Sequence, residues 1–156
     1  MYKKIIVPLD GSKLAESVLP HVEETAAKFG GEVILVTVTE RVLGYMPMEN
    51  YSQPAEQQLV PQAVGKMEKQ GQKYLDKIAK RLEAKGVKVQ TEVLLGNPAE
   101  EIILYVKNEG CDLVIMASHG RSGPSRWTHG SVAEKVFRAS HVPVLMVRAL
   151  NSAPST

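Results

Sequence analysis

The chain has 156 residues, enough for one domain that buries a hydrophobic core without disulfides or structural metals. Its formal net charge is +2 at pH 7, which gives little support for a nucleic-acid or membrane-surface partner. A single cysteine, Cys111, excludes an internal disulfide, and no apolar run approaches the roughly 20 residues that span a bilayer. We therefore expect a cytoplasmic protein without a signal peptide, with Cys111 as a packed thiol.

Apolar runs of strand length alternate along the chain with helical patterns, in which apolar residues recur at three- and four-residue steps. This alternation predicts right-handed crossovers and a parallel sheet with helices on both faces. The predicted strands are residues 3–9, 33–38, 87–95, 112–117 and 143–148. The predicted helices are residues 13–29, 64–84, 98–108 and 131–139.

Capping signals mark several helix ends. Ser12 is placed to cap the first helix and Gly30 to end it. Asn97 precedes Pro98 and lies three residues before Glu100, the pattern of a helix N-terminus. In the second predicted helix, Gly65 and Gly71 each cost about 1 kcal/mol relative to alanine, so we expect its first half to fray.

Residues 40–62 show no clean periodicity and contain three prolines. The segment is long for a loop in a compact domain, and two interpretations stay open: a functional cover or a mobile insertion. Residues 150–156 are small and polar and are expected to be disordered. We thus expect one domain over residues 1–149.

A basic, glycine-bearing loop joins the fourth predicted strand to the last predicted helix. Gly120 and Gly130 allow the main chain to approach an anion closely, and Ser131 is placed to donate its hydroxyl. The loop ends at a helix N-terminus, where unpaired N–H groups and the helix dipole favour a phosphate. This pattern predicts a phosphate-binding loop.

The same loop resembles the motif of nucleotide-binding universal stress proteins: a glycine, two residues, a second glycine, nine residues, then Gly-Ser or Gly-Thr. Gly120, Gly130 and Ser131 fit this spacing, whereas Ala117 stands where the first glycine is expected. Residues 5–12, 96–99 and 143–147 are also similar to the family, so the resemblance covers nearly the whole chain in order.

The resemblance implies an open five-stranded parallel sheet of order 3-2-1-4-5, a Rossmann-like fold of the adenine nucleotide alpha hydrolase-like type. Its strand order reverses between the first and fourth strands, and ligands of such sheets bind at that reversal. Asp10, at the end of the first strand, would face the phosphate loop there. A plainer interpretation of Asp10 is the first residue of an Asp-Gly turn.

The resemblance also implies which residues surround the nucleotide. Pro8, Val38 and Met116 would enclose the adenine, with Val38 acting through its backbone, although core packing explains Val38 and Met116 equally well. The phosphates would lie against Gly120, Gly130 and Ser131, with Ala117 beside the ribose. The complete expected site is Pro8, Leu9, Asp10, Val38, Met116, Ala117, His119, Gly120, Arg121, Gly130, Ser131 and Val132.

The expected ligand is ATP, with Mg²⁺ or Mn²⁺ bridging its phosphates. A resident metal site is not expected, because no carboxylate or cysteine lies at ligand spacing from His119 and His129.

The chain has no Gly-Lys-Ser or Gly-Lys-Thr motif, and no activated nucleophile stands out. We therefore expect a stress-response regulatory module that binds ATP, hydrolyses it slowly at most, and is read by an unidentified protein partner. The resemblance leaves an alternative, because some family members lack the glycine motif and act as dimeric interaction proteins without a nucleotide. Ala117 points toward that alternative.

The fifth predicted strand is expected to form a homodimer. Residues 142–147 are apolar on both faces, yet the expected order leaves them at a sheet edge, where unpaired backbone groups invite a second strand. The resemblance agrees, since family members commonly pair this strand across a two-fold axis.

Overall fold

The computed structural model describes residues 1–40, 54–118 and 131–148, with the backbone alone for residues 54–64. Within these ranges the chain forms one sheet of five parallel strands in the order β3-β2-β1-β4-β5, which confirms the expected topology. The strands are β1 (Lys4–Pro8), β2 (Glu32–Thr39), β3 (Val89–Leu95), β4 (Leu113–Ser118) and β5 (Val144–Arg148).

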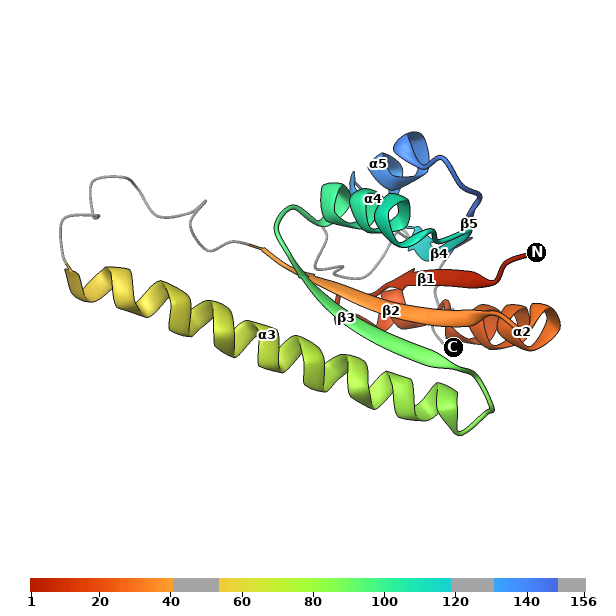
Figure 1. Ribbon diagram of the computed structural model, residues 1–156, viewed down its shortest axis with the longest axis horizontal. Helices are drawn as coiled ribbons and strands as arrows, with labels where there is room; N and C mark the ends of the chain where they lie inside the picture. The colour runs from red at the N-terminus through yellow and green to blue at the C-terminus, as the bar shows by residue number, and fades with distance from the viewer. Residues whose placement is uncertain (41–53, 119–130, 149–156) are drawn as a thin grey trace, which may run out of the picture.

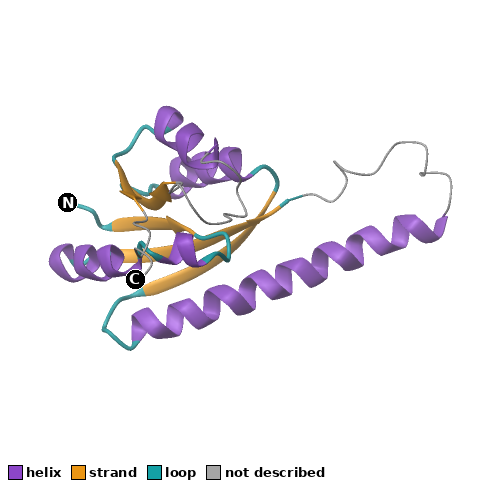
Figure 2. Ribbon diagram, turned by 180° about the vertical axis from the view of Figure 1, so that it is seen from behind, coloured by secondary structure: helices purple, strands orange, loops and turns teal. Residues whose placement is uncertain are grey.

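Helices cover both faces of the sheet (Figures 1 and 2). One face carries the helices that follow β1 and β2, and the other carries the helices that follow β3 and β4. The first group is α1 (Lys13–Glu16), α2 (Leu19–Phe29) and α3 (Pro54–Glu83). The second group is α4 (Pro98–Glu109) and α5 (Ser131–Ala139).

Side-chain alternation along the strands creates two hydrophobic cores. In β1, Ile5 and Val7 face the core under α1, α2 and α3, whereas Ile6 faces the core under α4 and α5. All three are fully buried. The central strands are apolar on both faces because helices cover both, as expected for a parallel sheet.

The helix predicted over residues 13–29 is in fact two helices. Pro20 lacks the N–H that would donate to the Glu16 carbonyl, so a continuous helix cannot form there. The chain instead makes a tight turn, in which the Ser17 amide donates to Leu14 O at 3.2 Å. Pro20 then lies in the first turn of α2, where a missing donor costs nothing.

The helix predicted over residues 64–84 begins ten residues earlier, at Pro54. The prediction that residues 40–62 form a loop is therefore wrong for residues 54–62, and residues 41–53 lie outside the described part. Proline at the first helical position explains the start, since its fixed φ suits a helix N-terminus. Figure 1 shows the N-terminal part of α3 extending beyond the sheet.

The predicted capping residues act as expected. Ser12 Oγ accepts from the Ala15 amide at 3.1 Å, and Asn97 Oδ1 accepts from the Glu100 amide at 3.2 Å. Gly30 ends α2 in the left-handed conformation, with φ of 66°. Across the described ranges, no helix is both long enough and apolar enough to cross a membrane.

Cys111 is buried in the core under α4 and α5, as expected for a packed thiol. Burial raises the pKa of its thiol to about 11, with Lys4 acting in the opposite direction. At pH 8 the thiol therefore stays protonated and weakly nucleophilic.

We predict that iodoacetamide labels native Cys111 at pH 8 at least about 100-fold more slowly than the urea-unfolded chain, because both access and thiolate fraction are low. Labelling should accelerate as the pH rises toward 11. Mass spectrometry of quenched samples measures the rates, with glutathione in the same buffers as the control for urea. Similar native and unfolded rates would contradict the burial.

Candidate functional site

The carboxyl ends of β1 and β4 separate at one edge of the sheet. The two strands pair at two positions only, Ile5 with Leu113 and Ile6 with Val114. Beyond these pairs, β1 continues along β2, whereas β4 continues along β5. The strand order reverses here, and reversals of this kind create the ligand crevice of open parallel sheets.

Asp10 follows β1 at this edge and is 4% exposed. Its Oδ1 accepts from the Ser12 amide at 2.9 Å and from the Ser12 hydroxyl. Ser12 in turn caps α1, and Gly11 between them has φ of 86°, which favours glycine. The Asp-Gly turn expected as the plainer interpretation is therefore present, and it holds the Asp10 carboxylate at the crevice.

Val38 presents its backbone to the same crevice. Thr39 O accepts from the Gly96 amide at 3.0 Å on the β3 side. Backbone groups of successive residues point to opposite sides of a strand, so those of Val38 point toward β1. Two residues earlier on β2, Val36 O accepts from the Leu9 amide at 2.8 Å, so this side of β2 faces β1. The Val38 N–H and C=O therefore lie beyond the end of β1.

The side chains of Val38 and Met116 belong to the core under α4 and α5, with exposures of 1% and 2%. Both side chains therefore pack in the core, as the alternative interpretation expected. Leu9 is fully buried in the opposite core, and Pro8 is the last residue of β1. The side chains of Leu9, Val38 and Met116 therefore lie in the cores, and the Leu9 amide donates to Val36 O.

Ala117 is a strand residue whose side chain packs against the core under α1, α2 and α3. Among the described residues, Tyr2 is the one non-glycine residue with a positive φ, so Ala117 has a negative φ. A methyl group at this position therefore causes no backbone strain.

Four expected site residues, His119, Gly120, Arg121 and Gly130, lie outside the described residues. Both ends of their loop are described: Ser118 ends β4 and Ser131 begins α5. The N-terminus of α5 therefore stands at the carboxyl edge of the sheet. Val132, in its first turn, packs against the core under α4 and α5.

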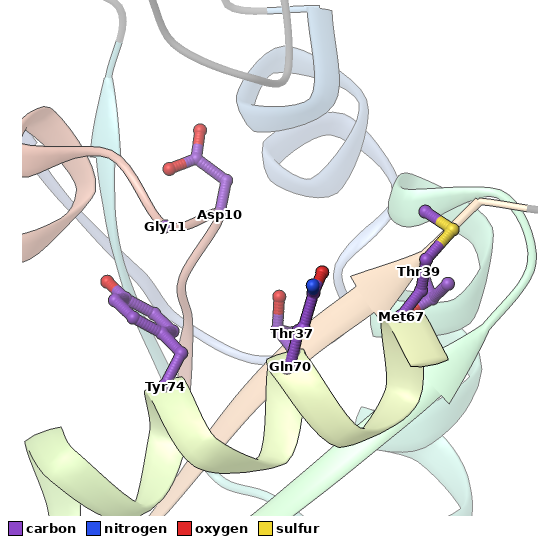
Figure 3. Close-up of a pocket in the computed structure, with 8 residues that line it drawn as sticks. Asp10, Gly11, Thr37, Thr39, Met67, Gln70 and Tyr74 are labelled. Carbon is purple, nitrogen blue, oxygen red and sulfur yellow. The ribbon is translucent and has the colours of Figure 1, made fainter. Parts of the chain in front are cut away.

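A pocket of about 200 Å³ opens beside Asp10, between the ends of β1 and β2 and the middle of α3. Figure 3 shows the labelled side chains from both strands and from α3 around this space. Its lining residues are Asp10, Gly11, Thr37, Thr39, Met67, Gln70, Gly71 and Tyr74.

Asp10 alone among these lining residues was expected in the site. Thr37 and Thr39 could have been found from the sequence, because they place hydroxyl groups at alternate positions after an apolar run over residues 33–36. Gln70 and Tyr74 could not have been found in this way, since polar residues on an amphipathic helix ordinarily form its solvated face. Their role depends on how α3 crosses the sheet.

Tyr74 closes the α1 side of the pocket. Its hydroxyl is buried and lies near the Glu16 carboxylate. Burial raises the pKa of Tyr74 above its ordinary value, and the nearby carboxylates of Glu16 and Asp10 raise it further. The hydroxyl therefore stays protonated and can donate to a ligand.

The described residues contain no group of three His, Cys, Asp or Glu side chains that could hold a metal ion. His119 and His129 lie outside them.

Gly96, which matches a glycine of the resembled family, has φ of 143°, and a β-carbon there would lie 2.7 Å from Glu101 Oε1. Its turn between β3 and α4 is the structural role expected for it.

These features define a Rossmann-like α/β domain with a ligand crevice at the reversal of strand order. Residues 1–148 match the Universal stress protein family, and the chain belongs to that family. Two curated relatives come from Methanocaldococcus jannaschii. Universal stress protein MJ0531 is 34% identical, covering 95% of this chain and 83% of that protein. Universal stress protein MJ0577 is 34% identical, covering 97% and 98%.

The structure of MJ0577 superposes with a TM-score of 0.78 and 34% identity, covering 97% of this chain and 99% of that one. A universal stress protein in complex with cAMP has a TM-score of 0.65 at 19% identity, covering 96% and 98%. The Archaeoglobus fulgidus universal stress protein in complex with dAMP has a TM-score of 0.61 at 20% identity, covering 93% and 97%. At these identities, the last two structures show similarity of fold alone.

Proposed function

We propose that this protein is a cytoplasmic, ATP-binding stress-response module whose bound state is read by a protein partner. The observation that carries the proposal is the crevice between β1 and β4, where the Val38 backbone, the buried Asp10 carboxylate and the N-terminus of α5 converge on one edge. A donor and an acceptor at Val38 suit the edge of an adenine, and the helix N-terminus suits phosphates.

Relatives support an adenine nucleotide as the ligand class. Two universal stress proteins of the same fold were solved with cAMP and with dAMP. The proposed site comprises Pro8, Leu9, the Val38 backbone, the Asp10 carboxylate, and the edge residues Met116 and Ala117. His119, Gly120, Arg121, Gly130, Ser131 and Val132 complete it around the phosphates.

Mg²⁺ or Mn²⁺ would bridge the phosphates and screen their charge near Asp10. The sequence has no Walker lysine to act on the outer phosphates. We therefore propose hydrolysis that is slow at most.

The alternative function is a dimeric interaction protein that binds no nucleotide. Ala117 in place of a motif glycine favours it, but the negative φ of Ala117 weakens that argument, because no glycine conformation is needed there.

We also propose a homodimer through β5. Among the described strands, β5 pairs with β4 alone, so its other edge carries backbone groups directed away from the sheet. Leu145 on this strand is 39% exposed and belongs to neither core. A second copy of β5 would pair this edge and cover Leu145.

Wild-type protein should bind ATP with a Kd in the micromolar range or somewhat weaker, and Gly130→Val should abolish binding because a β-branched side chain would occupy the phosphate space. Isothermal titration calorimetry measures both. Gly65→Val is the matched control, since a β-carbon at Gly65 meets nothing within 4 Å. Equal binding by wild type and Gly130→Val would show that the site is misplaced.

Ala117→Gly should change the ATP affinity less than threefold, since the Ala117 side chain packs against the core. It should lower the free energy of unfolding by up to about 1 kcal/mol, because glycine loses more entropy in a strand. Calorimetry and urea unfolding measure the two effects. A tenfold gain in affinity would instead mean that the methyl group crowds the ligand.

Wild-type protein should sediment as a dimer at tens of micromolar, and Leu145→Asp should shift it toward monomer, because a charge near the two-fold axis meets its own copy. Stability should fall only slightly, given the exposure of Leu145. Leu104→Asp is the control, an exposed leucine on α4 that should leave the dimer intact. A wild type that sediments as a clean monomer would contradict the proposed dimer.

A further inference from the structure

The buried polar side chains of the described residues gather in one place. Asp10, Thr37 and Thr39 are 4–5% exposed, and all three line the pocket between α3 and the ends of β1 and β2. Ligand sites are typically cavities in which a few polar groups converge, so the position of these three side chains around one cavity points to a ligand.

One polar group from β2 and one from α3 point into this pocket. Gly71 lets the helix approach β2 closely, since a β-carbon there would lie 3.1 Å from the Thr37 methyl group. With its methyl group against the helix, Thr37 directs its hydroxyl into the cavity. Figure 3 shows this hydroxyl and the Gln70 amide pointing the same way, toward the side on which Asp10 lies.

The chemistry of the lining suits a neutral, flat group. No lysine or arginine lines the pocket, and the Asp10 carboxylate would repel a phosphate. Hydroxyl and amide groups can both donate and accept, while Met67 and Tyr74 offer polarizable surfaces for a ring. A volume of about 200 Å³ fits part of a nucleotide and falls short of a whole drug-sized ligand.

The pocket also adjoins the backbone that would read a base. Thr37 and Thr39 flank Val38 on β2, so their side chains lie beside the Val38 N–H and C=O that face the crevice. A base held by this backbone would rest against the α3 side of the site.

We infer that two side chains of this pocket, the Thr37 hydroxyl and the Gln70 amide, bind the base of the nucleotide. The inference rests on the proposed function. It adds α3 to the binding machinery, so that base recognition uses side chains from the helix as well as the strand backbone.

The test compares wild type, Thr37→Val, Gln70→Ala and Gln72→Ala by calorimetry with ATP and with AMP. Thr37→Val keeps the side-chain shape and removes the hydroxyl. Gln72→Ala is the matched control, because this amide lies on another face of α3 and donates to Thr91 and Asp76. Melting temperatures without nucleotide report any loss of folding, and Gln70, being exposed, keeps the test valid if Thr37→Val is unstable.

Thr37→Val and Gln70→Ala should each weaken binding about threefold to tenfold, the effect of one lost hydrogen bond. The factor should be equal for ATP and AMP, since the base is common to both, and Gln72→Ala should stay within twofold of wild type. Unchanged affinities in both pocket variants, or a loss confined to ATP, would overturn the pocket assignment alone. A wild type that binds neither nucleotide would overturn the proposed function and this inference with it.

Discussion

The reversal of strand order between β1 and β4 is the constraint on which the rest of the structure depends. Right-handed crossovers send the chain from β1 to one face and from β4 to the other, so the two strands separate at their carboxyl ends. The Asp10 turn, the Val38 backbone and the start of α5 then reach the same edge from three different strands. Groups far apart in sequence meet there because the strand order brings the ends of their strands together.

Much of the fold could be predicted from local sequence. Apolar runs predicted all five strands to within two residues at each end, and Asn97 and Gly30 marked helix ends that the structure confirms. The errors came from prolines. Pro20 breaks a helix whose apolar spacing continues across it, while Pro54 begins a helix in a segment without periodicity. Apolar spacing reports which face is buried, whereas proline reports where backbone hydrogen bonds cannot form.

Part of the candidate site could likewise be predicted from the sequence, and part could not. Groups provided by the ends of strands follow from topology, so Asp10 could be expected at the crevice from a short motif and the strand order. Gln70 and Tyr74 could not, because their positions on α3 gain meaning only from the way this helix crosses β2. Helix packing angles depend on side chains distant in sequence, and no local pattern encodes them.

Gly71 shows how the two levels meet. Judged from propensity alone, it weakens α3 by about 1 kcal/mol relative to alanine. In the folded chain, the missing side chain is what lets α3 lie against Thr37 and Val93, with 3.1 Å and 3.5 Å from an ideal β-carbon to their methyl groups. An added β-carbon would press on the Thr37 methyl group, which lies beside the pocket. The residue that local analysis counts as a defect of the helix thus allows the close approach of α3 to β2.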